Sequence, residues 1–178
     1  VSIDDYAAGR QAVNHLLHLG HRRIAMIDAI DPNATEWPIG GRSLAYTDAL
    51  AENGLELDPQ LFLRVAWGAP SGADAMSRLL ALKEPPTAVF AHSDEIAIGA
   101  LRAIRRAGLR VPQDISVVAV EVNTQAAYSS PPLTTVRQDF QSVLDAAGFG
   151  KKIVGVPEAP MNAALAVLRA LRLSPVYK

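Results

Sequence analysis

Residues 85–108, PPTAVFAHSDEIAIGALRAIRRAG, contain the unit that decides the fold. The two prolines end the preceding segment, and Thr87–Ala91 is a short apolar run, typical of a strand that is buried on both faces. Ser93 or Asp94 can then cap a helix, because a side-chain oxygen at that position accepts a hydrogen bond from a free backbone N–H. Apolar residues follow at helical spacing, and Gly108 favours the end of the helix. The stretch therefore predicts a strand that leads directly into an amphipathic helix.

The chain outside this unit repeats the same alternation. Asp4 and Asp5 can cap a first helix that runs through Leu19. Further helices are predicted at Arg42–Asn53 and Ser71–Leu82, and further strands at Arg23–Ile27, Leu61–Val65 and Ile115–Val120. Short strands that alternate with amphipathic helices predict βαβ units. The predicted fold class is therefore α/β, with a parallel sheet covered by helices on both faces.

The pattern is weaker beyond Val120. Leu133–Val136 favours a short strand and Asp139–Ala147 a short helix, and Ile153–Val156 precedes a strongly helix-forming segment at Ala163–Leu173. Added to the four clear strands, Ile153–Val156 would complete a five-stranded, flavodoxin-like sheet of order 2-1-3-4-5. We expect one α/β lobe over residues 1–178, in which residues 141–178 form a closing helix and an added βα unit.

Composition excludes several classes of protein. The 178 residues contain 17 Lys and Arg against 18 Asp and Glu, for a net charge of −1, which fits one ordinary domain. Because there is no cysteine, disulfide scaffolds, thiolate zinc sites and cysteine nucleophiles are excluded. The near-zero charge argues against nucleic-acid binding by this chain, and no apolar run is long enough to cross a bilayer. We expect neither nucleic acid nor membrane among its partners.

Polar and aromatic side chains follow the predicted strands. The carboxyl ends of parallel strands share one edge of a sheet, which is where open α/β sheets bind ligands. Such a set can bind a small polar ligand, because an aromatic face packs on a sugar or base while Arg and carboxylates pair with hydroxyls or acids. These residues also have simpler interpretations. Ser93 or Asp94 could only cap a helix, and Trp67 could only cover the edge of the core. Arg42 and the loop acids Asp28 and Glu121 could be solvent-exposed residues that bind no ligand. The set comprises Asp28, Arg42, Trp67, His92, Ser93, Asp94, Glu121 and Asn123.

Signatures of catalysis and of metal binding are weak. The sequence contains no G-x-S-x-G, Walker or H-E-x-x-H motif. His15, His18 and His21 could suggest a metal site, but the predicted helix ends at Gly20, and cationic groups at a helix C-terminus explain this cluster. We therefore expect no catalytic residue, no metal and no cofactor.

Several motifs, in order and at characteristic spacing, resemble the lactose-repressor (LacI/GalR) family of transcription regulators. The resemblance covers residues 1–140. The matching motifs are Gly20–Ala25 (GHRRIA), Pro86–Ala91 (PTAVFA), Ser93–Ala103 (SDEIAIGALRA), Val111–Val118 (VPQDISVV) and Pro131–Gln138 (PPLTTVRQ).

The resemblance implies a periplasmic-binding-protein-like domain that binds a small effector, often a sugar or a nucleobase. Arg42 matches the arginine that holds effector hydroxyls or acids in the family, and Trp67 lies where the family often has a stacking aromatic. Family members also carry a DNA-binding headpiece, which we expect to lie outside this chain. A cytoplasmic monomer or homodimer is implied. The site residues implied by the resemblance are Arg42, Trp67, Ser93, Asp94, Glu121, Gln138 and Phe140.

The sequence also departs from the family pattern. Asp28-Ala29 replaces the usual Gly-Pro after the first strand, and Glu121 replaces a shorter acid. The tail after Phe140 differs most, so a hybrid or engineered single-lobe chain and a natural fragment remain alternatives. The functional hypotheses are an effector-binding module, a scaffold without retained activity, and a flavodoxin-like cofactor binder or enzyme. No residue supports the third, and we expect the chain not to be an enzyme.

Overall fold

The computed structural model describes residues 4–30, 40–121, 129 and 131–137. The chain divides into two compact units, of which one spans Asp4–Gln138. The other unit, residues 1–3 and 139–178, lies outside the described residues. The structure therefore describes the fold of the Asp4–Gln138 unit. The expectation of one lobe over residues 1–178 stays a prediction.

The described strands form one five-stranded parallel sheet of order β2-β1-β3-β4-β5. Their apolar runs are nearly continuous because both faces of the sheet are covered. This confirms the predicted fold class and strand order. The strands are β1 (Ile24–Ile30), β2 (Phe62–Ala66), β3 (Ala88–Ala91), β4 (Ser116–Glu121) and β5 (Thr134–Arg137).

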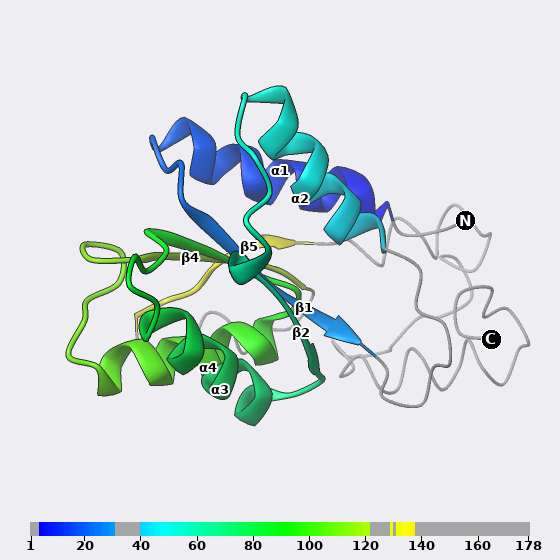
Figure 1. The fold of residues 1–178 in the computed structure, drawn as a ribbon. Helices are drawn as coiled ribbons and strands as arrows, with labels where there is room; N and C mark the ends of the chain where they lie inside the picture. Colours follow the sequence, from blue (N-terminus) through cyan, green and yellow to red (C-terminus); the bar gives the residue numbers. More distant parts are fainter. Residues whose placement is uncertain (1–3, 31–39, 122–128, 130, 138–178) are drawn as a thin grey trace, which may run out of the picture. The chain divides into compact units, whose positions relative to one another are not determined.

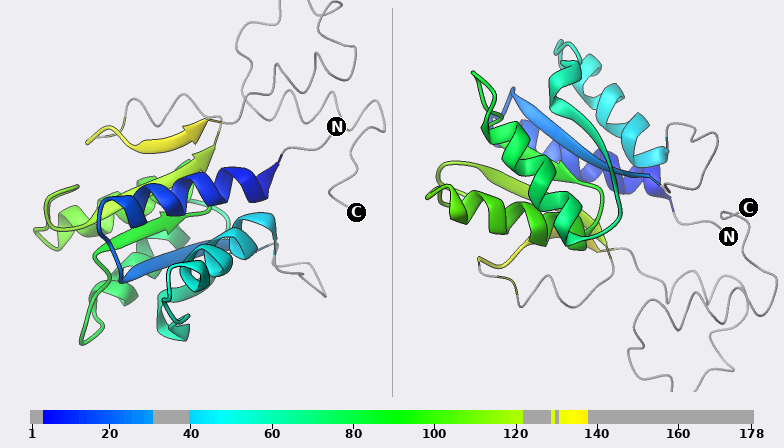
Figure 2. Two further views of the ribbon diagram at one scale, coloured as in Figure 1. Left: turned by 90° about the horizontal axis from the view of Figure 1, so that it is seen from above. Right: turned by 60° about the horizontal axis from the view of Figure 1, so that its bottom comes forward.

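Two pairs of helices cover opposite faces of the sheet (Figures 1 and 2). Alternate residues of β1 show the division: Ile24 and Met26 pack with α1 and α2, whereas Ala25 and Ile27 pack with α3 and α4. This alternation follows from the two-residue period of a strand. The helices are α1 (Asp5–His18), α2 (Gly41–Glu52), α3 (Ala69–Leu80) and α4 (Asp94–Arg106), with a short 3-10 helix at Pro59–Leu61.

The predicted helix starts are confirmed at two caps. The Asp4 side chain accepts a hydrogen bond from the backbone N–H of Ala7 at 2.8 Å, and Ser93 caps α4 through the N–H of Ile96 at 3.4 Å. Helix α3 starts earlier than predicted, after Gly68, whose φ of +113° few other residues adopt. Local capping chemistry therefore sets where α1 and α4 enter the fold.

Helices α3 and α4 approach each other closely through two glycines. A Cβ atom on Gly99 would lie 1.9 Å from the carbonyl oxygen of Ala69, and one on Gly72 would lie 2.2 Å from that of Ile96. Only glycine allows backbones this close. Helix α4 consequently lies directly against α3, which fixes the position of its first turn.

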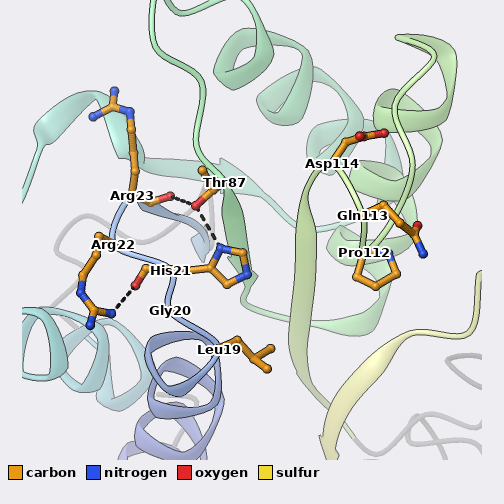
Figure 3. A pocket seen from close by; sticks show the side chains of 9 residues that line it. All are labelled: Leu19, Gly20, His21, Arg22, Arg23, Thr87, Pro112, Gln113 and Asp114. Carbon is orange, nitrogen blue, oxygen red and sulfur yellow. Dashed lines mark hydrogen bonds between the residues drawn. The ribbon is translucent and has the colours of Figure 1, made fainter.

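The amino ends of three strands meet at His21. Its Nδ1 is 3.0 Å from the Thr87 hydroxyl and its Nε2 is 3.0 Å from the Ser116 hydroxyl. We call this group the His21 junction. It borders a surface hollow of about 510 Å³, in which Figure 3 shows His21 directed toward Thr87. The hollow also contacts Arg22 and Asp114, and it lies at the amino edge of the sheet, opposite to the carboxyl ends of the strands.

The fifth strand differs from the prediction. The place beside β4 is taken by Thr134–Arg137, which overlaps the weakly predicted strand Leu133–Val136. Assigning that place to Ile153–Val156 was wrong, because the pairing edge of β4 is already occupied. Ile153–Val156, with the helices predicted at Asp139–Ala147 and Ala163–Leu173, lies outside the described residues. The described sheet therefore does not support a hybrid chain closed by an added βα unit.

Candidate ligand site at the carboxyl edge of the sheet

The polar side chains predicted at the strand ends lie on neighbouring elements. Asp28 is near the end of β1, Trp67 follows β2, and His92 and Ser93 join β3 to α4. Arg42 belongs to the first turn of α2. Because β2, β1 and β3 are adjacent and parallel, these residues gather at one edge.

Arg42 connects three parts of this edge. Its Nη1 donates to the backbone oxygen of His92 and, at 3.1 Å, to that of Val120 at the end of β4. Its Nε and Nη2 lie 2.9 Å from a carboxylate oxygen of Asp5 in α1. The side chain is buried rather than solvated, so its first role is to hold the rim of the site together.

The start of α4 contains a buried carboxylate. Asp94 is fully buried and accepts a hydrogen bond from Thr135 of β5 at 2.9 Å, while its Oδ2 has no hydrogen-bond partner among the described residues. Burial raises the pKa of Asp94, and the Thr135 hydrogen bond and the charge of Arg42 act against that rise. Asp94 thus holds a buried acceptor without a hydrogen-bond partner among the described residues, at the N-terminus of α4.

A second buried carboxylate pairs with a histidine. Asp28 Oδ1 lies 2.8 Å from His92 Nδ1, and Asp28 Oδ2 lies 3.7 Å from Arg64 Nε on the adjacent strand β2. The ring of His92 meets the indole of Trp67 edge to face, with centroids 5.2 Å apart. Trp67 remains 44% exposed, so its indole is also open to a ligand.

The predicted set is therefore only partly brought together in the described structure. Arg42, Trp67, Ser93 and Asp94 lie at the expected edge, and Ser93 also acts as the helix cap. Glu121 ends β4 opposite Arg137, but its side chain is outside the description. Gln138 and Phe140 lie outside the described residues.

Three contributing residues were missed. Arg64 approaches Asp28, Thr135 donates to Asp94, and Asp5 binds Arg42. Only strand register could have revealed Arg64, since it pairs with Asp28 across β1 and β2. The predicted strand at 133–136 contained the signal for Thr135, once that strand is placed beside β4.

Comparison with known proteins identifies the family to which this fold belongs. Residues 13–148 match the model of a periplasmic binding protein-like domain. The chain belongs to the periplasmic binding protein-like domain family. It is 40% identical over 139 residues to the HTH-type transcriptional repressor CytR of Escherichia coli, a match that covers 78% of this chain and 40% of CytR. The HTH-type repressor PurR of Erwinia tasmaniensis is 41% identical over 133 residues, covering 75% of this chain and 37% of PurR.

Solved structures of this family share the fold. A LacI-family regulator from Sanguibacter keddieii has a TM-score of 0.72 and 37% identity, covering 82% of this chain and 54% of that protein. The complex of the regulator CelR with cellobiose has a TM-score of 0.70 and 34% identity, covering 97% of this chain and 47% of CelR. The resemblance to LacI-type regulators is thereby confirmed. The chain spans about two fifths of the length of the curated relatives it matches.

Three further observations concern metal ligands, histidines and helix length in the described residues. No group of three or more potential metal-ligating side chains occurs among the residues that the structure describes. His15 and His18 are exposed on α1, whereas His21 is bonded to hydroxyls. None of the helices in the described ranges combines the length and apolar character needed to cross a bilayer.

Proposed function

We propose that this chain is the effector-binding part of a LacI-type transcription regulator and binds a small neutral sugar at the carboxyl edge of its sheet. The observation that carries the proposal is the gathering of Arg42, Trp67, Asp94 and the Asp28–His92 pair at that edge. Binding without a chemical reaction is the proposed activity, so the chain is proposed not to be an enzyme. Its relatives are transcriptional regulators, which supports a cytoplasmic location.

The chemistry of these side chains favours a polyhydroxylated ligand. The polar groups at this edge are mainly acceptors, which hydroxyl donors complement, and the unpartnered Oδ2 atoms of Asp28 and Asp94 lie buried behind them. The exposed indole of Trp67 can pack on the apolar face of a sugar ring. That CelR was solved with cellobiose is consistent with this ligand class.

Regulation would follow from binding in the whole protein. An effector shifts an equilibrium between two conformations only if it binds them with different affinity. We propose that contacts at this edge supply the difference, with nucleic acid bound by other parts of the regulator rather than by this chain. Both a monomer and a homodimer are compatible with the proposal.

The experiment is a ligand titration of the 178-residue chain followed by NMR and calorimetry. The panel contains glucose, galactose, ribose, cellobiose, adenosine and cytidine, each raised into the millimolar range. We expect saturable binding of at least one sugar, weakened roughly tenfold by Trp67→Ala because an aromatic packing surface is lost.

The matched control is Leu109→Ala, which shortens an exposed apolar side chain just beyond the C-terminus of α4, far from the strand ends. This variant should bind as the unmodified chain does. A flat response to every compound would refute the proposal and favour the alternative of a scaffold without retained ligand binding. Binding of nucleosides alone would move the ligand class from sugars to bases.

A further inference from the structure

The two histidines that the fold buries in part differ in how their ring nitrogens are used. In His21 both nitrogens contact hydroxyl groups of neighbouring strands, which is a structural arrangement. In His92 only Nδ1 is occupied, by Asp28 at 2.8 Å. No described residue forms a hydrogen bond with His92 Nε2, and this atom is not among the buried unsatisfied ones. His92 therefore keeps one ring nitrogen accessible at the proposed ligand edge.

The partner at Nδ1 determines what Nε2 can do. An ionised carboxylate only accepts hydrogen bonds, so the imidazole must carry its proton on Nδ1. In the neutral ring the other nitrogen is then an acceptor. Asp28 is held for this role, since its side chain is 2% exposed and Arg64 Nε lies 3.7 Å from its second oxygen.

The ring plane is also fixed. The Trp67 indole packs edge to face against the imidazole, with an interplanar angle of 84° and centroids 5.2 Å apart. Nδ1 and the ring edge are thus both restrained, while the His92 side chain retains 17% exposure. An acceptor with a fixed direction lies next to an exposed aromatic surface.

Starting from the proposed function, we propose that His92 is a specificity-determining residue that accepts a hydrogen bond at Nε2 from one hydroxyl of the sugar, and that Asp28 is its positioning residue. A sugar ring packed on Trp67 would bring a hydroxyl to the ring nitrogen. In the neutral imidazole Nε2 is an acceptor, which a hydroxyl donor complements and an ionised acid group, itself only an acceptor, does not. The pair therefore selects a neutral hydroxyl over an acid.

The positioning step can be measured without a ligand. Long-range proton–nitrogen NMR at mildly alkaline pH distinguishes Nδ1–H from Nε2–H imidazole, and His92→Gln assigns the signals. We expect the Nδ1–H form in the unmodified chain and its loss or mixing in Asp28→Asn, whose amide can donate as well as accept. A dominant Nε2–H form in the unmodified chain would overturn the assignment.

The recognition step is measured with the sugar that binds in the panel and its monodeoxy analogues. His92→Phe should weaken binding about tenfold, His92→Gln should restore part of it through its amide oxygen, and His18→Phe on the exposed end of α1 should change nothing. One deoxy analogue should bind the unmodified chain about tenfold more weakly than the parent sugar does. On His92→Phe the same analogue and the parent sugar should bind almost equally.

The outcomes separate the two proposals. Unchanged sugar binding in His92→Phe would overturn the role of His92 and leave the proposed function standing. So would a loss of affinity for each deoxy analogue that is the same in His92→Phe as in the unmodified chain. The absence of any sugar binding to the unmodified chain would overturn both.

Discussion

Replacing Gly99 with alanine should destabilise the protein because it forces α3 and α4 apart. The new Cβ would lie 1.9 Å from the carbonyl oxygen of Ala69 and 2.8 Å from the backbone nitrogen of Ala73. Both are backbone atoms of α3, so neither can yield by a rotamer change. The whole helix would have to move.

The expected magnitude follows from two opposing effects. Overpacking of a close contact costs roughly 1–3 kcal/mol, and a backbone contact this short belongs at the upper end. Alanine regains about 1 kcal/mol of helix propensity relative to glycine. The free energy of unfolding should therefore fall by about 2 kcal/mol, which lowers Tm by about 4–8 °C in a chain of this size.

The assay is urea and thermal unfolding followed by far-UV circular dichroism. Gly40→Ala is the matched control, because the same substitution there meets no atom within 4 Å. The control should change the free energy of unfolding by less than about 1 kcal/mol. A Gly99→Ala variant as stable as the unmodified chain would refute the close packing of α3 and α4.

Three further changes test the buried polar groups. Burial lowers the pKa of His21. Below the ordinary value of about 6.5 the unfolded chain therefore binds a proton that the folded chain does not, and the free energy of unfolding decreases as the pH is lowered. His21→Gln should flatten the unfolding profile between about pH 8 and pH 5 in urea titrations, and an unchanged slope would contradict this. Burial raises the pKa of Asp94, so Asp94→Asn should gain stability relative to the unmodified chain as pH rises from about 4, whereas a pH-independent difference would count against it. The Tyr46 hydroxyl donates to the buried Ile24 oxygen at 2.8 Å; Tyr46→Phe should cost about 1 kcal/mol in the same titrations and the exposed control Tyr6→Phe less, and equal costs would argue against a buried bond.

Local chemistry explains why most of the fold could be predicted from the sequence. The Asp4 and Ser93 caps and the apolar runs of β1, β3 and β4 depend on neighbouring residues, so their signals are visible in a short window. The place of β5 depends on long-range pairing instead. No amphipathic helix was predicted between β4 and Thr134, so the βαβ rule did not point to this strand.

The candidate site divides in the same way. Arg42, Trp67, Ser93 and Asp94 were predicted because the ends of parallel strands share an edge whatever their exact register. Arg64 and Thr135 could not be, because their roles depend on which residue lies beside them on the next strand or at the start of α4. The Asp28–His92 contact likewise joins residues that are 64 positions apart.

The His21 junction has a consequence for how the sheet assembles. Its three members lie at the entry points of β1, β3 and β4, and in the observed pairing each hydroxyl lies 3.0 Å from a ring nitrogen of His21. A slip of one residue between two of these strands would turn the incoming side chain to the opposite face and leave an imidazole nitrogen without its hydroxyl. The junction thus helps to specify strand register, because it destabilises sheets in other registers that would otherwise bury similar amounts of apolar surface.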